Sequence, residues 1–280
     1  MLPGFYAGLV RNHPFISAIL GCIVVAVLGA SIPHGNAKQS LAYLTAVTLS
    51  VVVIDVMCLR GQARPAQIPV RDSGLESLVL IVCWVTALAF LTCRFVFNYR
   101  PTGVGLRLAW IAIGLGTVFA VIPALFLLGR RYWPADLGLR FPGVVVALPV
   151  LAIFATITFL FSRHSITWSR ALEESGSPMG LAQTAISACV PEEFFRTAWQ
   201  TRVGTWLKNP ATGWLTGSIA WAALHGPIAY SHSHSLAEST LGVMNIVPLG
   251  LLWGYLTHRT GSFLPSMLLH GLNFWGLQNS

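Results

Sequence analysis

The chain is built mainly from apolar blocks that are long enough to cross a lipid bilayer. About 20 helical residues span the hydrocarbon core, because an α-helix rises about 1.5 Å per residue. Blocks of this kind lie at residues 14–32, 40–59, 76–97, 107–128, 143–161, 178–200, 211–228, 241–257 and 262–278. With 55% hydrophobic and 9% charged residues, the chain also has too little polar surface for a soluble domain. The sequence therefore predicts an all-α fold, a polytopic transmembrane bundle of about eight or nine spans.

The distribution of charge predicts an orientation and excludes one class of partner. In a membrane protein, a net charge of +8 indicates cytoplasmic loops and anionic lipid rather than nucleic acid. If the spans are as given, ten of the 17 basic residues lie on the side that holds Arg11, and six lie on the other side. We therefore expect a cytoplasmic N-terminus, with the lipid bilayer as a partner and no nucleic acid. The first block lacks a small-residue cleavage site, so we expect it to be a retained span.

The two halves of the chain differ in character. The spans before residue 132 hold few polar residues, whereas polar residues recur inside the spans from residue 178 onward. A turn-rich connector over residues 133–140 lies between them. We therefore divide the chain into N-terminal transmembrane spans, residues 1–132, and a C-terminal transmembrane core that carries the chemistry, residues 133–280.

Two adjacent glutamates and an arginine lie inside the predicted span 178–200. Residues 191–196 read Pro-Glu-Glu-Phe-Phe-Arg. An ionisable residue at bilayer depth is costly and indicates a functional site by default. On a helix, Arg196 lies about one turn from both Glu192 and Glu193, so its guanidinium can hold one carboxylate while the other points elsewhere.

Three further polar residues lie near the middle of later spans. His225 and His270 are each followed by a glycine, and Asn273 lies on the same helical face as His270. A shared intramembrane polar cavity with Glu192 would explain all of these residues together. A carboxylate in such a cavity can take a proton from water, while imidazole or amide groups donate to a developing oxyanion.

Two other charges, Asp55 and Arg94, lie near the ends of their spans. They can extend toward the membrane interface or pair with each other. Either arrangement predicts a structural role.

Three motifs occur in order, each in its own apolar span: Glu192-Glu193-x-x-Arg196, an aromatic residue four positions before His225, and His270 followed by an asparagine. This pattern resembles the signature of the CPBP family, the CAAX-processing and bacteriocin-processing glutamic intramembrane endopeptidases, which include the Ras-converting CAAX endopeptidases. The resemblance extends over residues 133–280, where Leu137-Gly-Leu-Arg140 resembles the entry segment of the family.

The resemblance implies an activity and a role for each motif residue. It implies an intramembrane protease of a bacterial inner (cell) membrane that hydrolyses a peptide bond in a membrane-anchored protein or peptide, without a cofactor or metal. Glu192 would be the general base that activates water, and His225 would assist it. The oxyanion hole would be formed by His270 and Asn273, and Glu193 with Arg196 would be a structural pair.

The chain departs from the resembled pattern at two positions. Trp221 stands where the family usually has phenylalanine, an exchange compatible with packing behind His225. The family usually has asparagine four residues after the last histidine, whereas this chain has Phe274 there and Asn273 one residue earlier. We consider Trp221 and Phe274 candidate substrate-binding residues.

Three other functions fit parts of the pattern. A zinc-dependent membrane protease could use two histidines and two glutamates, but no His-Glu-x-x-His is present and Arg196 would repel a dication. A non-catalytic membrane immunity or accessory protein could keep the same scaffold, although it would have no reason to hold these costly groups at one depth. A transporter would typically show broken helices in two repeated halves, which the sequence lacks.

Overall fold

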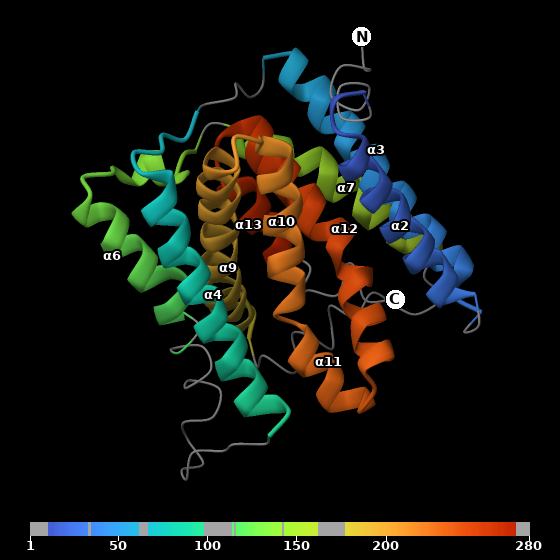
Figure 1. Ribbon diagram of the computed structural model, residues 1–280. Helices are drawn as coiled ribbons and strands as arrows, with labels where there is room; N and C mark the ends of the chain where they lie inside the picture. Colours follow the sequence, from blue (N-terminus) through green and yellow to red (C-terminus); the bar gives the residue numbers. More distant parts are fainter. Residues whose placement is uncertain are drawn as a thin grey trace.

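The computed structural model describes residues 11–32, 35–61, 67–97, 114, 116–141, 143–161 and 177–272. All regular structure in these residues is helical (Figure 1). In chain order the elements are α2 (Pro14–Ser31), α3 (Ala37–Leu59), α4 (Ser73–Phe95), η2 (Thr117–Val121), α6 (Ile122–Gly129), η3 (Pro134–Leu137), η4 (Val144–Val146), α7 (Ala147–Phe161), α9 (Pro178–Trp206), α10 (Pro210–Ala223), α11 (Gly226–Ser233), α12 (Leu236–Thr260) and α13 (Leu264–Leu272). The prediction of an all-α transmembrane bundle is confirmed.

Four of the described helices are long and apolar enough to cross a membrane. These are α2, α3, α4 and α12, and the segments Thr117–Gly129 and Val144–Ile157 are shorter apolar helices. Large apolar side chains such as Phe15, Leu41 and Val82 are exposed on the outside of these helices. Lipid rather than water suits such a surface. The protein is therefore an integral membrane protein.

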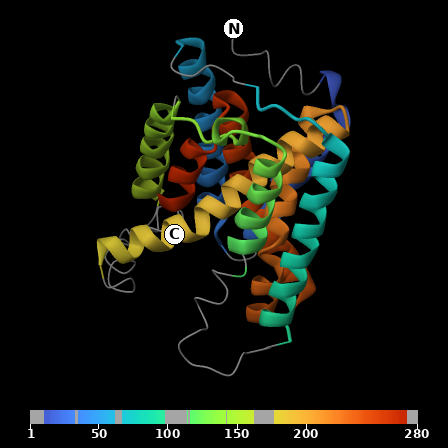
Figure 2. The ribbon, with the colours of Figure 1, turned by 90° about the vertical axis from the view of Figure 1, so that its left-hand side faces the viewer.

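The C-terminal helices form the centre of the bundle. Helix α9 packs against α4, α10 and α13, and α12 packs against α2, α3, α10 and α13. Figure 2 shows α9, in yellow and orange, as a long helix that crosses the middle of the molecule. Helices α2, α3 and α7 lie on one side of this centre, and α4 with α6 lies on the other (Figure 1).

Glycines allow the central helices to approach closely. A Cβ atom on Gly213 of α10 would lie 2.4 Å from the carbonyl oxygen of Gln200 of α9. A Cβ on Gly254 of α12 would lie 2.9 Å from Nη1 of Arg196. Small residues at helix contacts in membranes allow backbones to pack tightly. The spacing of α9, α10 and α12 therefore depends on these two glycines.

One predicted span is interrupted. The sequence predicted a continuous span at residues 211–228, but α10 ends at Ala223, and a turn at Leu224 and His225 precedes α11. Pro227 lies in the first turn of α11, where its missing N–H costs nothing and its fixed φ favours a helix start. The interruption places His225 at a helix junction, not in the middle of a span.

The predicted alternative that Asp55 pairs with Arg94 is wrong. The Asp55 carboxylate lies 3.0 Å from Nε of Arg259 and accepts a hydrogen bond from Tyr255, both on α12. Arg94 lies in the last turn of α4, with its guanidinium over the ring of Phe95. The sequence pattern could not show that α3 packs against α12. Asp55 therefore ties the N-terminal helices to the central ones.

A second group of charged side chains joins α4, α6 and α9, with Glu76 and Arg202 fully buried. We call it the Glu76 cluster: Asp72, Glu76, Arg130, Tyr132 and Arg202. Glu76 Oε1 accepts a 2.8 Å hydrogen bond from Tyr132 and lies 3.6 Å from Nε of Arg130. Its other oxygen, Oε2, lies 3.4 Å from Nε of Arg202. Tyr132 lies between α6 and η3. Its pKa is raised, mainly by burial and next by the hydrogen bond to Glu76, so its hydroxyl stays protonated and donates. The sequence analysis did not identify Glu76, although it is an acidic residue at the start of an apolar block.

Candidate active site

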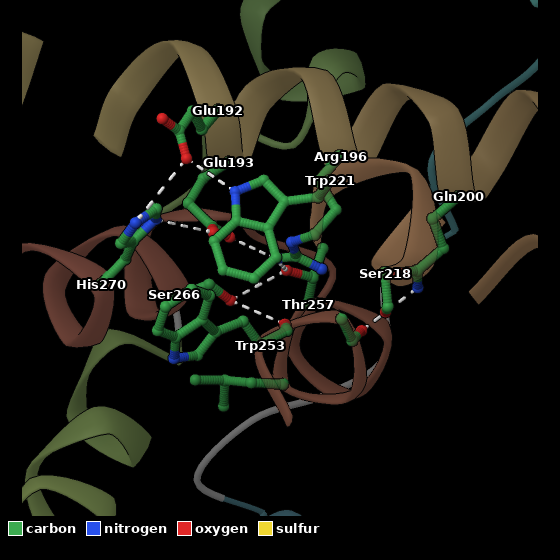
Figure 3. Close-up of polar contacts among 12 residues, drawn as sticks. Glu192, Glu193, Arg196, Gln200, Ser218, Trp221, Trp253, Thr257, Ser266 and His270 are labelled. Atoms are coloured by element: carbon green, nitrogen blue, oxygen red, sulfur yellow. Dashed lines mark hydrogen bonds and ion pairs between the residues drawn. The ribbon is translucent and has the colours of Figure 1, made fainter. Parts of the chain in front are cut away.

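Four helices contribute the side chains of a polar cluster in the centre of the bundle (Figure 3). We call it the Glu192 site: Glu192, Glu193 and Arg196 of α9, Trp221 of α10 and His270 of α13. Trp253 and Thr257 of α12 and Ser266 of α13 surround it. The cluster thus forms where α9, α10, α12 and α13 meet.

The two adjacent glutamates lie in different environments. The side chain of Glu193 is fully buried, with Oε2 paired with Arg196 and Oε1 lying 3.2 Å from Nδ1 of His270. The side chain of Glu192 is 20% exposed, and no cation pairs with it among the described arginines and lysines. Its Oε2 accepts a 2.6 Å hydrogen bond from Nε1 of Trp221. Glu192 is therefore the carboxylate that water or a substrate can reach.

His270 lies between these two carboxylates. Its Nδ1 faces Glu193 at 3.2 Å, and its Nε2 lies 3.7 Å from Oε2 of Glu192. A carboxylate paired with an arginine is an acceptor, so the hydrogen-bond network assigns a proton to Nδ1. The imidazole also stacks on Trp253, with ring centroids 4.3 Å apart and planes inclined by 20°. These contacts fix both the tautomer and the ring plane.

A chain of hydrogen bonds links Arg196 to the helix that carries His270. Nη2 of Arg196 donates to Oγ1 of Thr257 at 3.4 Å, and Thr257 contacts Oγ of Ser266 at 2.9 Å. Ser266 donates in turn to the carbonyl oxygen of Trp253 at 2.8 Å. The sequence analysis missed Trp253 and Thr257, although their spacing of four residues places them on one face of α12.

His225 lies next to this group but does not contact Glu192 directly. Its ring meets that of Trp221 edge-on, with centroids 4.9 Å apart, and Nδ1 lies 3.4 Å from the carbonyl oxygen of Trp221. In the described part of the chain, no hydrogen bond or ion pair joins His225 to Glu192. The structure thus brings Glu192, Glu193, Arg196 and His270 together, and Trp221 connects His225 to them.

The remaining predicted site residues differ in what the structure says of them. Trp221, considered a substrate-binding candidate, is 5% exposed and its indole donates to Glu192. Asn273 and Phe274 lie outside the described residues. The roles predicted for these two residues remain predictions.

The geometry of the titratable groups bears on metal binding. Among the described residues, no three His, Cys, Asp or Glu side chains are placed to hold a metal ion. Both oxygens of Glu193 are engaged, one by Arg196 and the other by His270. The arrangement around His270 is an imidazole held between carboxylates, which suits proton transfer and hydrogen bonding.

Comparisons with known proteins relate the C-terminal part of the chain to a protein family. The chain is an integral membrane protein whose C-terminal helices are similar to a CAAX-protease type of domain. Residues 174–275 match the family model described as type II CAAX prenyl endopeptidase Rce1-like, and the match includes Glu192, Trp221, His225 and His270. This match supports membership of the CPBP family for the C-terminal part of the chain.

A curated relative and the solved structures give less information. The Lipid A 4'-phosphatase of Bacteroides thetaiotaomicron is 26% identical over 188 residues, which cover 61% of this chain and 80% of that protein. No solved structure matches the chain.

Proposed function

We propose that this protein is an intramembrane endopeptidase that hydrolyses a peptide bond in a membrane-anchored protein or peptide, with Glu192 activating the water. The observation that carries the proposal is the contrast between the adjacent glutamates. Glu193 is buried and paired with Arg196, whereas Glu192 is 20% exposed beside His270. A partly exposed carboxylate with no arginine or lysine partner is suited to accept a proton. The match to the Rce1-like family supports a protease of this kind.

The reaction follows from the properties of these groups. Glu192 takes a proton from water as the water oxygen attacks the peptide carbonyl, and the carbonyl oxygen becomes an oxyanion. The C–N bond then breaks, and the proton held by Glu192 passes to the leaving amine. The products are a carboxylic acid and an amine, which exchange the remaining proton to become a carboxylate and an ammonium group, and Glu192 returns to its ionised form. A general base of this kind typically contributes about 10²–10⁴-fold to the rate.

The contact with Glu193 places a condition on His270. Nδ1–H of His270 donates to Glu193, so in the neutral imidazole Nε2 carries no proton and can only accept. To donate to an oxyanion from Nε2, His270 must carry protons on both nitrogens. We assign this doubly protonated form to the reacting enzyme, with Asn273 as the second donor and His225 assisting Glu192 through Trp221. The predicted polar cavity is part of this proposal.

Hydrolysis of a lipid phosphate is the alternative that the named phosphatase relative raises. A phosphate group needs cationic or N–H donors that can reach it. Arg196 has a fully buried side chain and is paired with Glu193, and the accessible group of the site is a carboxylate, which repels phosphate. The geometry therefore favours attack on a neutral carbonyl.

The proposal is tested by comparing membranes that contain the wild-type protein with membranes that contain Glu192→Gln at equal abundance. Mass spectrometry of the membrane-anchored proteins and peptides should show shortened species with the wild type and intact precursors with Glu192→Gln. Mass spectrometry of the lipids in the same samples provides the control. Loss of a phosphate from a lipid, with no change in any peptide, would contradict the proposal and favour the phosphatase reaction. A lack of any difference between the two membranes would favour a non-catalytic role.

A further inference from the structure

The indole of Trp221 directly contacts the proposed base. Its Nε1 lies 2.6 Å from Oε2 of Glu192, and the ring is 5% exposed. An indole N–H only donates, so the direction of this hydrogen bond is fixed. Hydrogen bonds to an ionised acceptor are shorter and stronger than neutral ones. The sequence suggested only that Trp221 packs behind His225. The hydrogen bond to Glu192 gives the residue a further role.

The surroundings of Trp221 prevent its ring from turning. The ring lies edge-on to His225, Trp253 and His270, at centroid distances of 4.9, 5.1 and 5.5 Å. On the α12 side, a Cβ atom on Gly250 would lie 2.9 Å from Cε3 of the indole. Trp221 thus presents its N–H from a position fixed by neighbours at the α10–α11 junction and on α12 and α13.

The indole and the imidazole approach the same oxygen of Glu192. Trp221 donates to Oε2, and Nε2 of His270 lies 3.7 Å from that same atom. Within the described residues, Oε1 of Glu192 has no hydrogen bond or ion pair. The two oxygens therefore differ, because one is anchored and the other is left available on the exposed side chain.

We infer that Trp221 is a positioning residue whose indole N–H holds Oε2 of Glu192 and thereby directs Oε1 to the water. This inference rests on the proposed function. Phenylalanine at this position would fill most of the same volume but could not donate the hydrogen bond, so Glu192 would be free to change rotamer. Misplacement of a reacting group by about 1 Å can lower a rate by about 10²-fold.

Trp214 provides a matched control. It lies two turns earlier on α10, is 8% exposed, and its Nε1 donates at 2.9 Å to the carbonyl oxygen of Leu251 on α12. Trp214→Phe therefore removes a buried indole hydrogen bond from the same helix, α10, to α12 without touching Glu192. Any loss that comes only from packing or stability should appear in both variants.

Kinetics of the purified full-length protein test the positioning role. For Trp221→Phe we expect kcat to fall about 10–100-fold, with KM little changed because the base and not the substrate is affected. Trp214→Phe should keep the wild-type kcat, and both variants should melt at similar temperatures. Equal kcat values for Trp221→Phe and Trp214→Phe would overturn the inference.

A measurement that does not need activity separates this inference from the proposed function. In protein labelled with ¹⁵N on the tryptophan indoles, Trp221→Phe identifies the Nε1–H signal of Trp221. Glu192→Ala should shift that signal and speed its exchange with solvent, whereas the signal of Trp214 should stay in place. An unchanged Trp221 signal would refute the hydrogen bond, whatever the activity. A shifted signal in a protein that cleaves no peptide would uphold the contact and reject the proposed function instead.

Discussion

Helix α9 contributes to two groups of charged side chains that are paired in different ways. In the Glu76 cluster, both oxygens of Glu76 face partners: Tyr132 and Arg130 on one side and Arg202 on the other. In the Glu192 site, the one arginine pairs with Glu193. Glu192 is left with an indole donor and an imidazole, and its side chain is 20% exposed.

We interpret the Glu76 cluster as structural and propose that the Glu192 site is functional. A buried ion pair whose partners satisfy each other orders the helices that it joins, and removing one partner is costly. A carboxylate at membrane depth with no arginine or lysine partner is a cost that a structural role does not explain. Near its C-terminal end, α9 is thus held by the ion pair of Arg202 with Glu76. In its middle, α9 carries Glu192, which has no arginine or lysine partner among the described residues.

The largest effect on stability should come from the Glu76 cluster. Glu76→Gln leaves the fully buried Arg202 without its carboxylate, and we expect a loss of about 3–5 kcal/mol in unfolding free energy. Thermal unfolding in detergent would measure the loss. Asp72→Asn is the matched control, because the Asp72 side chain is 44% exposed and its pair with Arg130 should contribute at most about 1 kcal/mol. A Glu76→Gln protein as stable as Asp72→Asn would contradict a stabilising role for the buried pair of Glu76 with Arg202.

A smaller effect is expected where α12 passes the Glu192 site. In Gly254→Ala the new Cβ would lie 2.8 Å from Cδ1 of Trp214 and 2.9 Å from Nη1 of Arg196, so we expect destabilisation of about 1–3 kcal/mol. Activity should fall as well, because Arg196 holds Glu193 and Glu193 holds His270. Gly29→Ala is the control, since nothing lies within 4 Å of its Cβ position on α2. Equal stability of the two variants would show that α12 can shift away from α9 without affecting the site.

The smallest expected effect is that of chelation. The proposed reaction uses a carboxylate and imidazoles for proton transfer and oxyanion stabilisation, so the purified enzyme should keep its activity after exhaustive treatment with a chelator. Peptide cleavage before and after treatment, together with the metal content of the protein, would measure this. Loss of activity that zinc alone restores would give the histidines the role of metal ligands.

Much of the fold followed from the sequence because membrane insertion leaves a strong signal. The apolar blocks at residues 14–32 and 40–59 predicted α2 and α3 to within three residues at each end. The break before α11 was missed, because apolarity continues through the turn at Leu224 and His225. Hydropathy also cannot show which spans are neighbours, and for that reason the partner of Asp55 was not predicted.

Some of the residues that meet around His270 could be predicted from the sequence, but their contacts could not. Charge inside an apolar span identified Glu192, Glu193 and Arg196, and helical spacing suggested the ion pair. Spacing could not decide which glutamate takes the arginine, since both lie about one turn away. It also could not show that Trp221 turns its N–H toward Glu192, because that depends on how α10 packs against α9.

The most direct test of the account compares Glu192→Gln with Glu193→Gln in the purified protein, measuring peptide cleavage and thermal unfolding on the same samples. Glu192→Gln should lower kcat/KM by about 10²–10⁴-fold while the melting temperature stays near that of the wild type. Glu193→Gln should lower the melting temperature, because it breaks the buried pair with Arg196. Near-normal cleavage by Glu192→Gln would contradict the claim that the unmatched carboxylate is the catalytic base.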